Sequence, residues 1–358
     1  MEFYFLQLFL IFVYWIIIGK LRIKKITKTK IFLFFVWTHL FLLEGFRSLD
    51  FGADQWYQYL YLQITKIPWS KILRYNDFVN EKSEIGYIVL NKFLSDISKE
   101  VQFLYVFVSA IYLSSVCIFF RKYSHFPVIS VFIFFVSFWF QSFYVLRQYL
   151  AIGLCLFSLH YVVSRNLKIF IGIIILAFSM HQTSIVFLPV YFLYNYYLEV
   201  NKRNLFLYLL LCILMAYSIG FLMNLAVGNL VGYDSYLDSE IMSDGNLKMA
   251  FVYISFFITY AMFTFRRKTT LVENLFFKML GIAIMLQIAG SQFVLMQRLN
   301  LYYAISLLII IPNTIKHIKS VPFKLAFVIF TIFLFTYIMY QDFEKNRYQV
   351  LPYSSILF

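Results

Sequence analysis

Long apolar runs, separated by short polar segments, extend along the whole chain. Runs of about twenty apolar residues match the roughly 30 Å of hydrocarbon that a membrane-spanning helix must cross. The pattern predicts about twelve such helices, within a range of eleven to thirteen, over residues 3–19, 31–46, 101–120, 127–143, 145–163, 168–180, 183–198, 205–230, 248–265, 275–296, 299–315 and 325–341.

The sixth and seventh predicted spans, 168–180 and 183–198, are unusual because a polar break lies between them. The sixth is short for a full crossing. The pair is equally compatible with two half-helices that dip into the membrane from an outward-facing cavity, where water or protein satisfies the non-helical backbone.

Composition agrees with a membrane protein. The 358 residues are 62% hydrophobic and 13% charged, with a mean hydropathy of +0.77, whereas soluble domains are roughly half apolar and about a quarter charged. These values exclude a soluble enzyme, a nucleic-acid-binding protein and a disulfide scaffold. We predict an all-α polytopic membrane protein with a single integral membrane domain over 1–358, in which residues 47–100 form an outward-facing loop segment.

The net charge of +14 reflects topology. Of the 31 basic residues, 18 lie in alternate loops beside only two acidic residues, Glu199 and Glu273. The 18 are Lys20, Arg22, Lys24, Lys25, Lys28, Lys30, Arg121, Lys122, Arg165, Lys168, Lys202, Arg203, Arg266, Arg267, Lys268, Lys316, Lys319 and Lys324. The positive-inside rule places these loops in the cytoplasm, and both termini and the 47–100 segment outside. The charge therefore requires no nucleic-acid partner.

Three arginines, Arg47, Arg147 and Arg298, lie at outer membrane boundaries, against this rule. One arginine at a helix end often extends to lipid headgroups, so each alone is compatible with a simple anchor. As a set they indicate anion binding, because a guanidinium group forks onto two phosphate oxygens. The sequence therefore predicts a diphosphate site at the outer leaflet.

His181 lies in the polar break, ahead of Thr183 and Ser184, which are candidates to cap a helix whose N-terminus points into a cavity. Histidine is the side chain most often used as a general base near neutral pH. The alternative is a histidine that only satisfies a polar contact.

The outer segment offers two carboxylates, Asp54 and Glu84. Asp54 follows Gly52, which permits a tight turn. Ser83 beside Glu84 is typical of a helix N-cap. Glu44, near the outer end of the second span, is within reach of an arginine at the surface. The alternative interpretation is a solvated loop with interfacial aromatic residues and a cap.

Five short motifs, in this order, resemble the EpsG-like group of Wzy-type polysaccharide polymerases, which are membrane glycosyltransferases of the GT-C kind. Ile85 occupies a position where that group commonly has proline. The likeness covers about residues 45–315. The motifs are Arg47–Tyr57, as R-x(4)-G-x-D-x-x-Y; Glu84–Tyr87, near E-P-G-Y/F; Arg147–Ile152, near R-Q-x-[IL]-A; Leu176–Ser184, near L-A-x-x-x-H-x-[ST]-[AS]; and Arg298–Tyr303.

The resemblance implies a multi-pass protein of the bacterial cytoplasmic (inner) membrane, with its active site facing the periplasm. The substrate would be an oligosaccharide repeat unit on undecaprenyl diphosphate. The growing chain would pass from its lipid diphosphate to the non-reducing end of a fresh repeat unit. That linkage already holds the bond energy, so no nucleotide or other cofactor is implied. A chain-length-regulating partner protein is left open.

The implied chemistry has two requirements. Charge on the departing diphosphate must be stabilised, for which we expect Arg147 and Arg298, with Arg47 third, in place of a metal ion. An acceptor hydroxyl must lose its proton, and the candidates are His181, Asp54 and Glu84 in that order. The aromatic candidates for stacking on sugar rings are Tyr57, Tyr87, Tyr233 and Tyr236.

Two other functions fit the same kind of chain. A flippase for lipid-linked oligosaccharides would need ionisable groups near mid-membrane and usually paired halves. Here the ionisable groups cluster at outer ends, with Lys278 as the main exception. An O-antigen ligase would use the same arginine and histidine chemistry. The chain has no P-loop, dinucleotide-binding glycine motif, metal-spaced cluster or nucleophile elbow.

Overall fold

The structure is a computed structural model that describes residues 1–52, 56–77, 83–227, 247–265, 267–291, 295–346 and 348–357. Within these ranges the regular elements are helices, together with one isolated bridge between Arg47 and Ser355. The predicted all-α class is therefore confirmed. The chain divides into two compact units, and the single domain over 1–358 stays a prediction. Unit 1 comprises 1–161, 168–185 and 325–358, and unit 2 comprises 162–167 and 186–324.

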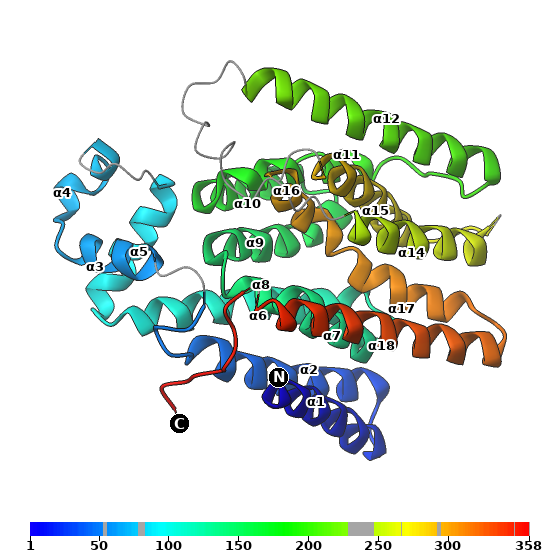
Figure 1. Cartoon of the computed structure of the whole chain (residues 1–358), viewed down its shortest axis with the longest axis horizontal. Coiled ribbons are helices and arrows are strands. Elements are labelled where there is room, and N and C mark those ends of the chain that lie inside the picture. The colour runs from blue at the N-terminus through cyan, green and yellow to red at the C-terminus, as the bar shows by residue number, and fades with distance from the viewer. Residues whose placement is uncertain are drawn as a thin grey trace. The chain divides into compact units, whose positions relative to one another are not determined.

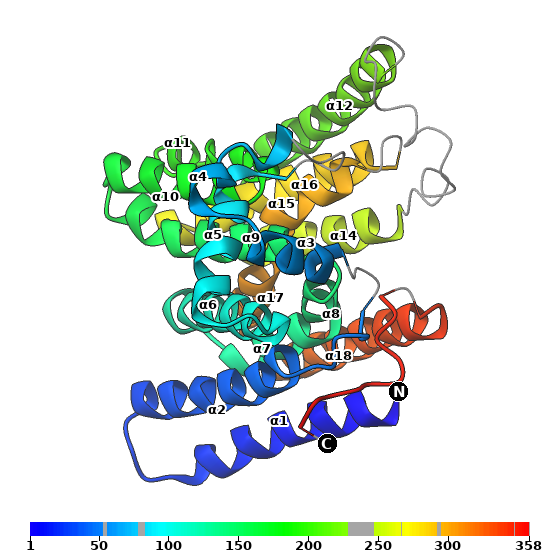
Figure 2. The ribbon, with the colours of Figure 1, turned by 90° about the vertical axis from the view of Figure 1, so that its left-hand side faces the viewer.

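Unit 1 is built from long apolar helices. Helix α1 (Glu2–Lys20) packs along α2 (Lys25–Gly45), and α2 packs along α6 (Val101–Tyr123), as Figures 1 and 2 show. The two helices approach closely at Gly45, where an added Cβ would lie only 3.4 Å from the Val106 backbone. These helices lie where the hydropathy pattern predicted the spans 3–19, 31–46 and 101–120.

The rest of unit 1 contains a helical run that turns sharply before the next helix. This run consists of α7 (Pro127–Phe134), the π-helical turn η2 (Phe135–Trp139) and α8 (Phe140–Ser142). The tight turn expected after it is present, because α9 (Leu146–Val163) begins four residues later. The other long elements are α10 (Leu167–Met180) and α18 (Val321–Glu344).

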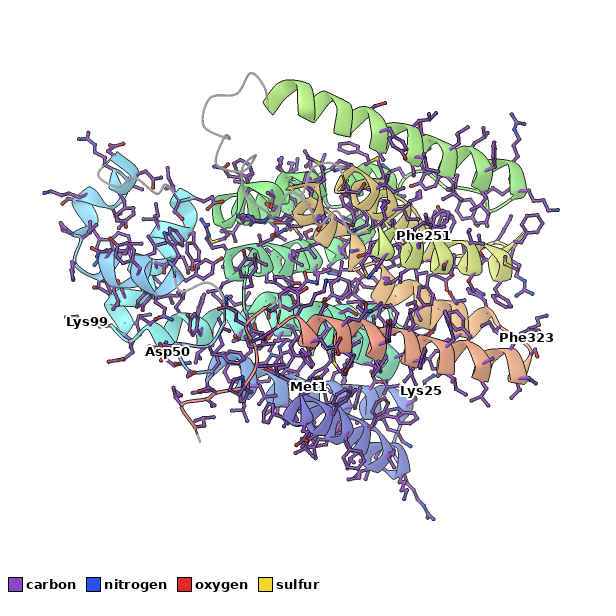
Figure 3. All side chains as sticks on the ribbon, viewed as in Figure 1. Met1, Lys25, Asp50, Lys99, Phe251 and Phe323 are labelled. Atoms are coloured by element: carbon purple, nitrogen blue, oxygen red, sulfur yellow. The ribbon has the colours of Figure 1, made fainter. Side chains whose placement is uncertain are left out.

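The outer segment folds as a group of short helices beyond the ends of α2 and α6 (Figures 1 and 2). In Figure 3, Asp50 and Lys99 lie at one end of unit 1, and Lys25 lies toward the other. The short helices are α3 (Trp56–Thr65), α4 (Trp69–Ile72), η1 (Tyr75–Asp77) and α5 (Ile85–Ile97).

Unit 2 is organised around α15 (Leu271–Ala289), which packs against four neighbouring helices and the short α11. A capping box between Thr270 and Glu273 fixes its N-terminus. Gly281 leaves room for the Tyr208 ring, which any Cβ there would overlap. The remaining elements are η3 (Gln182–Phe187), which begins in unit 1, and α11 (Val190–Leu193), α12 (Lys202–Val227), α14 (Lys248–Thr264), α16 (Leu295–Ala304) and α17 (Leu307–His317).

Six of the described helices are long and apolar enough to cross a membrane, namely α1, α2, α6, α9, α15 and α18. The bent pair Met296–Ala304 and Leu307–His317 raises the number to 7 if it is one span. The protein is therefore a multi-pass membrane protein. Shorter apolar helices cover other predicted spans, at Pro127–Ser142, Leu167–Met180, Gln182–Leu193 and Lys248–Thr264. Twelve crossings and a GT-C-like arrangement stay predictions.

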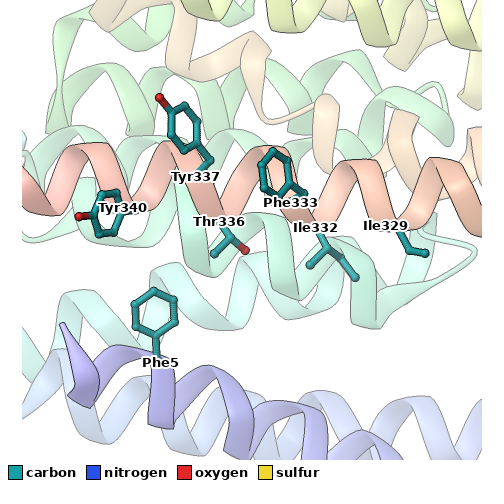
Figure 4. A pocket seen from close by; sticks show the side chains of 7 residues that line it. All are labelled: Phe5, Ile329, Ile332, Phe333, Thr336, Tyr337 and Tyr340. Atoms are coloured by element: carbon teal, nitrogen blue, oxygen red, sulfur yellow. The ribbon is translucent and has the colours of Figure 1, made fainter.

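An apolar groove of about 520 Å³ lies between α1 and α18 (Figure 4). Phe5 faces it from α1, and six residues of α18 complete the lining. Its walls carry hydroxyl groups but no charged side chain, so the groove is suited to apolar chains. None of the candidate site residues lines it.

Candidate active site

Glu84 is the residue that immediately precedes α5, and its backbone is extended (φ −64°, ψ 134°). Gly86, two residues later, determines where Glu84 lies. A Cβ on Gly86 would lie 2.7 Å from the carbonyl oxygen of Ser179 and would also overlap the Ser179 side chain. The first turn of α5 therefore reaches the end of α10 only because residue 86 has no side chain. This approach brings Glu84 beside His181, two residues beyond Ser179.

One carboxylate joins two of the predicted site residues. Glu84 Oε2 accepts a hydrogen bond from Arg147 Nη1 at 2.6 Å, and Oε1 lies 3.0 Å from His181 Nδ1. The backbone N–H of Gln182 also donates to Oε1, at 3.2 Å. The side chains of Arg147 and His181 stay 22% and 16% exposed, so both are partly open to a ligand. Three separate sequence motifs thus meet at one point in unit 1.

Arg147 lies in the first turn of α9, where the positive end of the helix dipole disfavours a cation. Its Nη1 donates to Ser83 Oγ at 2.8 Å in addition to Glu84. Aromatic rings surround the guanidinium, with centroids 4.7 Å from Cζ for Trp56 and 5.8 Å for Tyr57. A cation and a helix N-terminus both attract an anion, and in the structure the Glu84 carboxylate supplies one.

The pKa of Glu84 explains what this carboxylate can do. Burial raises the pKa of Glu84. The hydrogen bond from His181 and the nearby charges of Arg147 and His181 lower it by more than burial raises it, so the pKa falls from 4.5 to about 2. Glu84 is therefore ionised at neutral pH and is a weak base, and both of its oxygens already accept hydrogen bonds. An ionised carboxylate only accepts, so His181 presents Nδ1–H to Glu84. In the neutral form of the imidazole, Nε2 then carries the lone pair that can take a proton.

We expect Glu84→Gln to lower thermal stability by an amount that depends on pH. A carboxyl group whose pKa is lowered in the folded state stabilises the fold at pH values above its ordinary pKa of 4.5. This stabilisation disappears as the pH falls toward 2. The difference in Tm between wild type and variant, measured in detergent, should be constant from about pH 6 to 8 and shrink below about pH 4.5. Glu100→Gln, at an exposed position, is the matched control. An unchanged difference down to pH 3 would contradict the assignment.

Arg47 is placed differently from the expectation of a third diphosphate contact. It is 1% exposed, and its Cζ lies 4.0 Å from the ring centroid of Tyr105 and 5.0 Å from that of Phe143. Its Nη1 donates to the carbonyl oxygen of Glu44 at 3.2 Å, and the Glu44 carboxylate accepts from Trp139 Nε1 at 2.8 Å. Arg47 does pair with Glu44 at the backbone, but this burial favours a structural role.

The predicted sugar-stacking residues Tyr57 and Tyr87 are also buried, at 4% and 0% exposure. Both rings lie within 6 Å of Arg147 Cζ. They enclose the guanidinium rather than present an open face for a sugar. Arg298 lies half-buried in α16, in unit 2, whereas Arg147 lies in unit 1. The predicted residues outside the described part of the chain are Asp54, Tyr233 and Tyr236.

Three contributors were not anticipated. Ser83 was expected to cap α5, which is wrong: Glu84 occupies the N-cap position without a side-chain cap bond, and the Ser83 hydroxyl accepts from Arg147. Trp56 and the Gln182 backbone N–H complete the surroundings. Trp56 could have been found from the sequence, because it is adjacent to Tyr57 within the first motif. The Gln182 backbone N–H could not, because every residue except proline has such a donor. Ser184 Oγ is buried and has no hydrogen-bond partner among the described residues, so it does not cap a helix.

The Glu84–Arg147–His181 cluster can therefore bind an anion and accept a proton at adjacent points. The guanidinium supplies a permanent positive charge. The oriented imidazole supplies a proton acceptor. Among the described residues, no group of three or more His, Cys, Asp or Glu side chains could hold a metal ion.

Comparison with known proteins gives one match. None of the curated proteins and none of the solved structures matches the sequence. The family model described as "EpsG family" matches residues 30–355, which include all of the described cluster. The chain therefore belongs to the EpsG family, a family of polysaccharide polymerase-type membrane proteins.

Proposed function

We propose that this protein is a polysaccharide polymerase of O-antigen, capsule or exopolysaccharide. It moves a glycan chain from undecaprenyl diphosphate to the non-reducing end of another lipid-linked repeat unit, at the periplasmic face of the bacterial inner membrane. Family membership supports the class of reaction. The observation that carries the specific reaction is the single carboxylate of Glu84, which orients both an arginine and a histidine.

Arg147 acts on the donor. When the sugar–diphosphate bond breaks, its electron pair leaves with the lipid diphosphate, and negative charge grows on those oxygens. A preorganised guanidinium near a helix N-terminus stabilises this charge more than it stabilises the ground state. The present contacts of Nη1 with Ser83 and Glu84 hold the side chain in place before substrate arrives.

His181 acts on the acceptor. The hydroxyl oxygen at the non-reducing end of the fresh repeat unit attacks the anomeric carbon of the donor sugar, and His181 Nε2 takes the hydroxyl proton. Glu84 supports this step, because it holds Nδ1–H and stabilises the imidazolium that forms. The weak basicity of Glu84 itself favours His181 as the base over Glu84.

A flippase is the second candidate, and its strongest feature was Lys278 within an apolar helix. The Lys278 ammonium group donates to the backbone carbonyls of Leu193 and Tyr196, and the residue is 4% exposed. This pairing gives the buried lysine a structural role, as a partner for carbonyls at the end of α11. It supports the polymerase over the flippase, while an O-antigen ligase remains the nearest enzyme alternative.

Deletion of the gene tests the proposed reaction. We expect the deletion strain to lose the long-chain ladder of surface polysaccharide on a gel and to keep one repeat unit attached, because transfer of single units does not require the polymerase. Plasmid-borne wild type should restore the ladder. Loss of every repeat unit would instead indicate a flippase or a ligase, and would contradict the proposal.

A further inference from the structure

Helix α5 carries apolar residues on its outward face. Ile85, Val89, Phe93 and Ile97 recur every four residues, so they form one stripe along the helix. Ile85, Phe93 and Ile97 are 53%, 54% and 60% exposed. A helix at a water-facing surface normally presents polar residues on such a face. The stripe is therefore an exposed apolar surface of unit 1, which an apolar neighbour would stabilise.

The neighbouring helices repeat this pattern. On α3, Tyr59 and Leu62 are exposed and share a face at three-residue spacing. On and just after α4, Trp69 and Leu73 are exposed as well. Exposed apolar side chains thus continue over three helices of the outer segment, whereas isolated exposed apolar residues would need no explanation.

A short chain connection and two hydrogen bonds hold these helices at the N-terminal end of α6. Helix α5 ends at Ile97, four residues before Val101 begins the candidate span α6. The Tyr61 hydroxyl donates to the carbonyl oxygen of Ser98 at 2.7 Å, and Trp69 Nε1 donates to Asp96 Oδ2 at 2.6 Å. Helices α3 and α4 are therefore tied to the junction between α5 and α6, at the N-terminal end of this candidate span.

The charges of this segment suit a lipid surface. Along α3, α4 and η1, between Trp56 and Asp77, the exposed charged residues are Lys66, Lys71 and Arg74 against one acidic residue, Asp77. On α5, the exposed Asp96 is paired with Lys92 at 2.8 Å. Basic side chains beside apolar ones are typical of helices that lie in the headgroup region of anionic membranes. Tryptophan and tyrosine are likewise enriched at this depth.

We infer that α3, α4 and α5 form an interfacial membrane-binding element, whose exposed apolar side chains enter the outer leaflet while Lys66, Lys71 and Arg74 contact lipid phosphates. Because the stripe extends over the whole of α5, this helix lies along the surface rather than across it. Glu84, at its N-terminus, is then held at headgroup depth. Membrane binding by the element does not depend on the proposed polymerase reaction.

Site-directed spin labelling of the full chain in liposomes tests this inference. Cys117, Cys155 and Cys212 are first replaced by alanine. Single cysteines at Leu62, Phe93 or Ile97 are then labelled with a nitroxide, and collision with oxygen, which partitions into lipid, is compared with collision with a water-soluble nickel chelate. Phe330, exposed on the span α18, is the lipid control, and Asp77 is the water control.

We expect labels at Leu62, Phe93 and Ile97 to favour oxygen, as at Phe330, and the label at Asp77 to favour the nickel chelate. Replacing Lys71 and Arg74 by glutamine should lower the oxygen preference at Ile97 in anionic liposomes but not in phosphatidylcholine liposomes. A nickel preference equal to that of Asp77 would overturn the inference. So would protection from both reagents, which would indicate a protein interface. Size-exclusion profiles show which variants are folded. Because each of the three positions is labelled in a separate variant, a folding failure in one leaves the other two as tests.

Discussion

An Arg147→Lys variant is expected to abolish the long-chain polysaccharide ladder at an unchanged protein level. Lysine keeps the positive charge but loses the planar fork that binds two oxygens together. Lysine has a single nitrogen, so if it donates to Ser83 and Glu84 as Nη1 does, no second nitrogen is left to bind the diphosphate. Loss of one preorganised donor to developing negative charge costs about 10²–10³-fold in rate. The measurement is chain length on a gel, with the tagged protein quantified from the same membranes.

Arg165→Lys is the matched control for this variant. Arg165 follows the other end of α9 and lies over the Tyr194 ring, with 4.5 Å from Cζ to the centroid, so it shares a cation–aromatic contact but not the site. Its ladder should equal that of wild type. A normal ladder from Arg147→Lys would remove Arg147 as the diphosphate contact.

A His181→Gln variant is expected to lose about 10²–10⁴-fold in turnover, which is the usual contribution of a general base. Glutamine retains an N–H donor for Glu84, so the packing between α5 and the end of α10 should persist, while the basic nitrogen is removed. The assay uses purified protein and a lipid-linked repeat unit, with thermal unfolding as the check on folding.

His160→Gln provides the control for the histidine, because His160 is exposed and pairs with Lys122 away from the cluster. It should keep wild-type turnover. If His181→Gln keeps more than half of the activity, the proton acceptor is another group. Asp54, the other carboxylate candidate, would then be the next residue to replace.

The sequence placed His181 ahead of Glu84 as the candidate base, but it gave no physical reason to set Glu84 aside. Both were candidate bases, since a carboxylate and an imidazole each accept protons. The ranking depends on what surrounds each group. Glu84 receives hydrogen bonds on both oxygens and lies beside a cation, which lowers its pKa to about 2 and makes it a weak proton acceptor. This agrees with the proposed role of His181.

The three outward arginines illustrate the same limit. All three were expected to contact the diphosphate, with Arg47 placed third after Arg147 and Arg298. In the structure Arg47 is enclosed by Tyr105 and Phe143, while Arg147 is partly exposed and joined to Glu84. Burial distinguishes them, and burial of a loop residue depends on packing that no local pattern encodes.

The sequence by itself determined the all-helical membrane class, the turns before α9 and after α10, and the short motifs that carry the candidate chemistry. These properties follow from hydropathy and charge, which act locally along the chain. Only the tertiary structure decided that Glu84 meets Arg147 and His181, which are 63 and 97 residues away. The physical reason is close packing: the contact exists because Gly86 lets the start of α5 approach Ser179, and such a fit depends on the shapes of both helices.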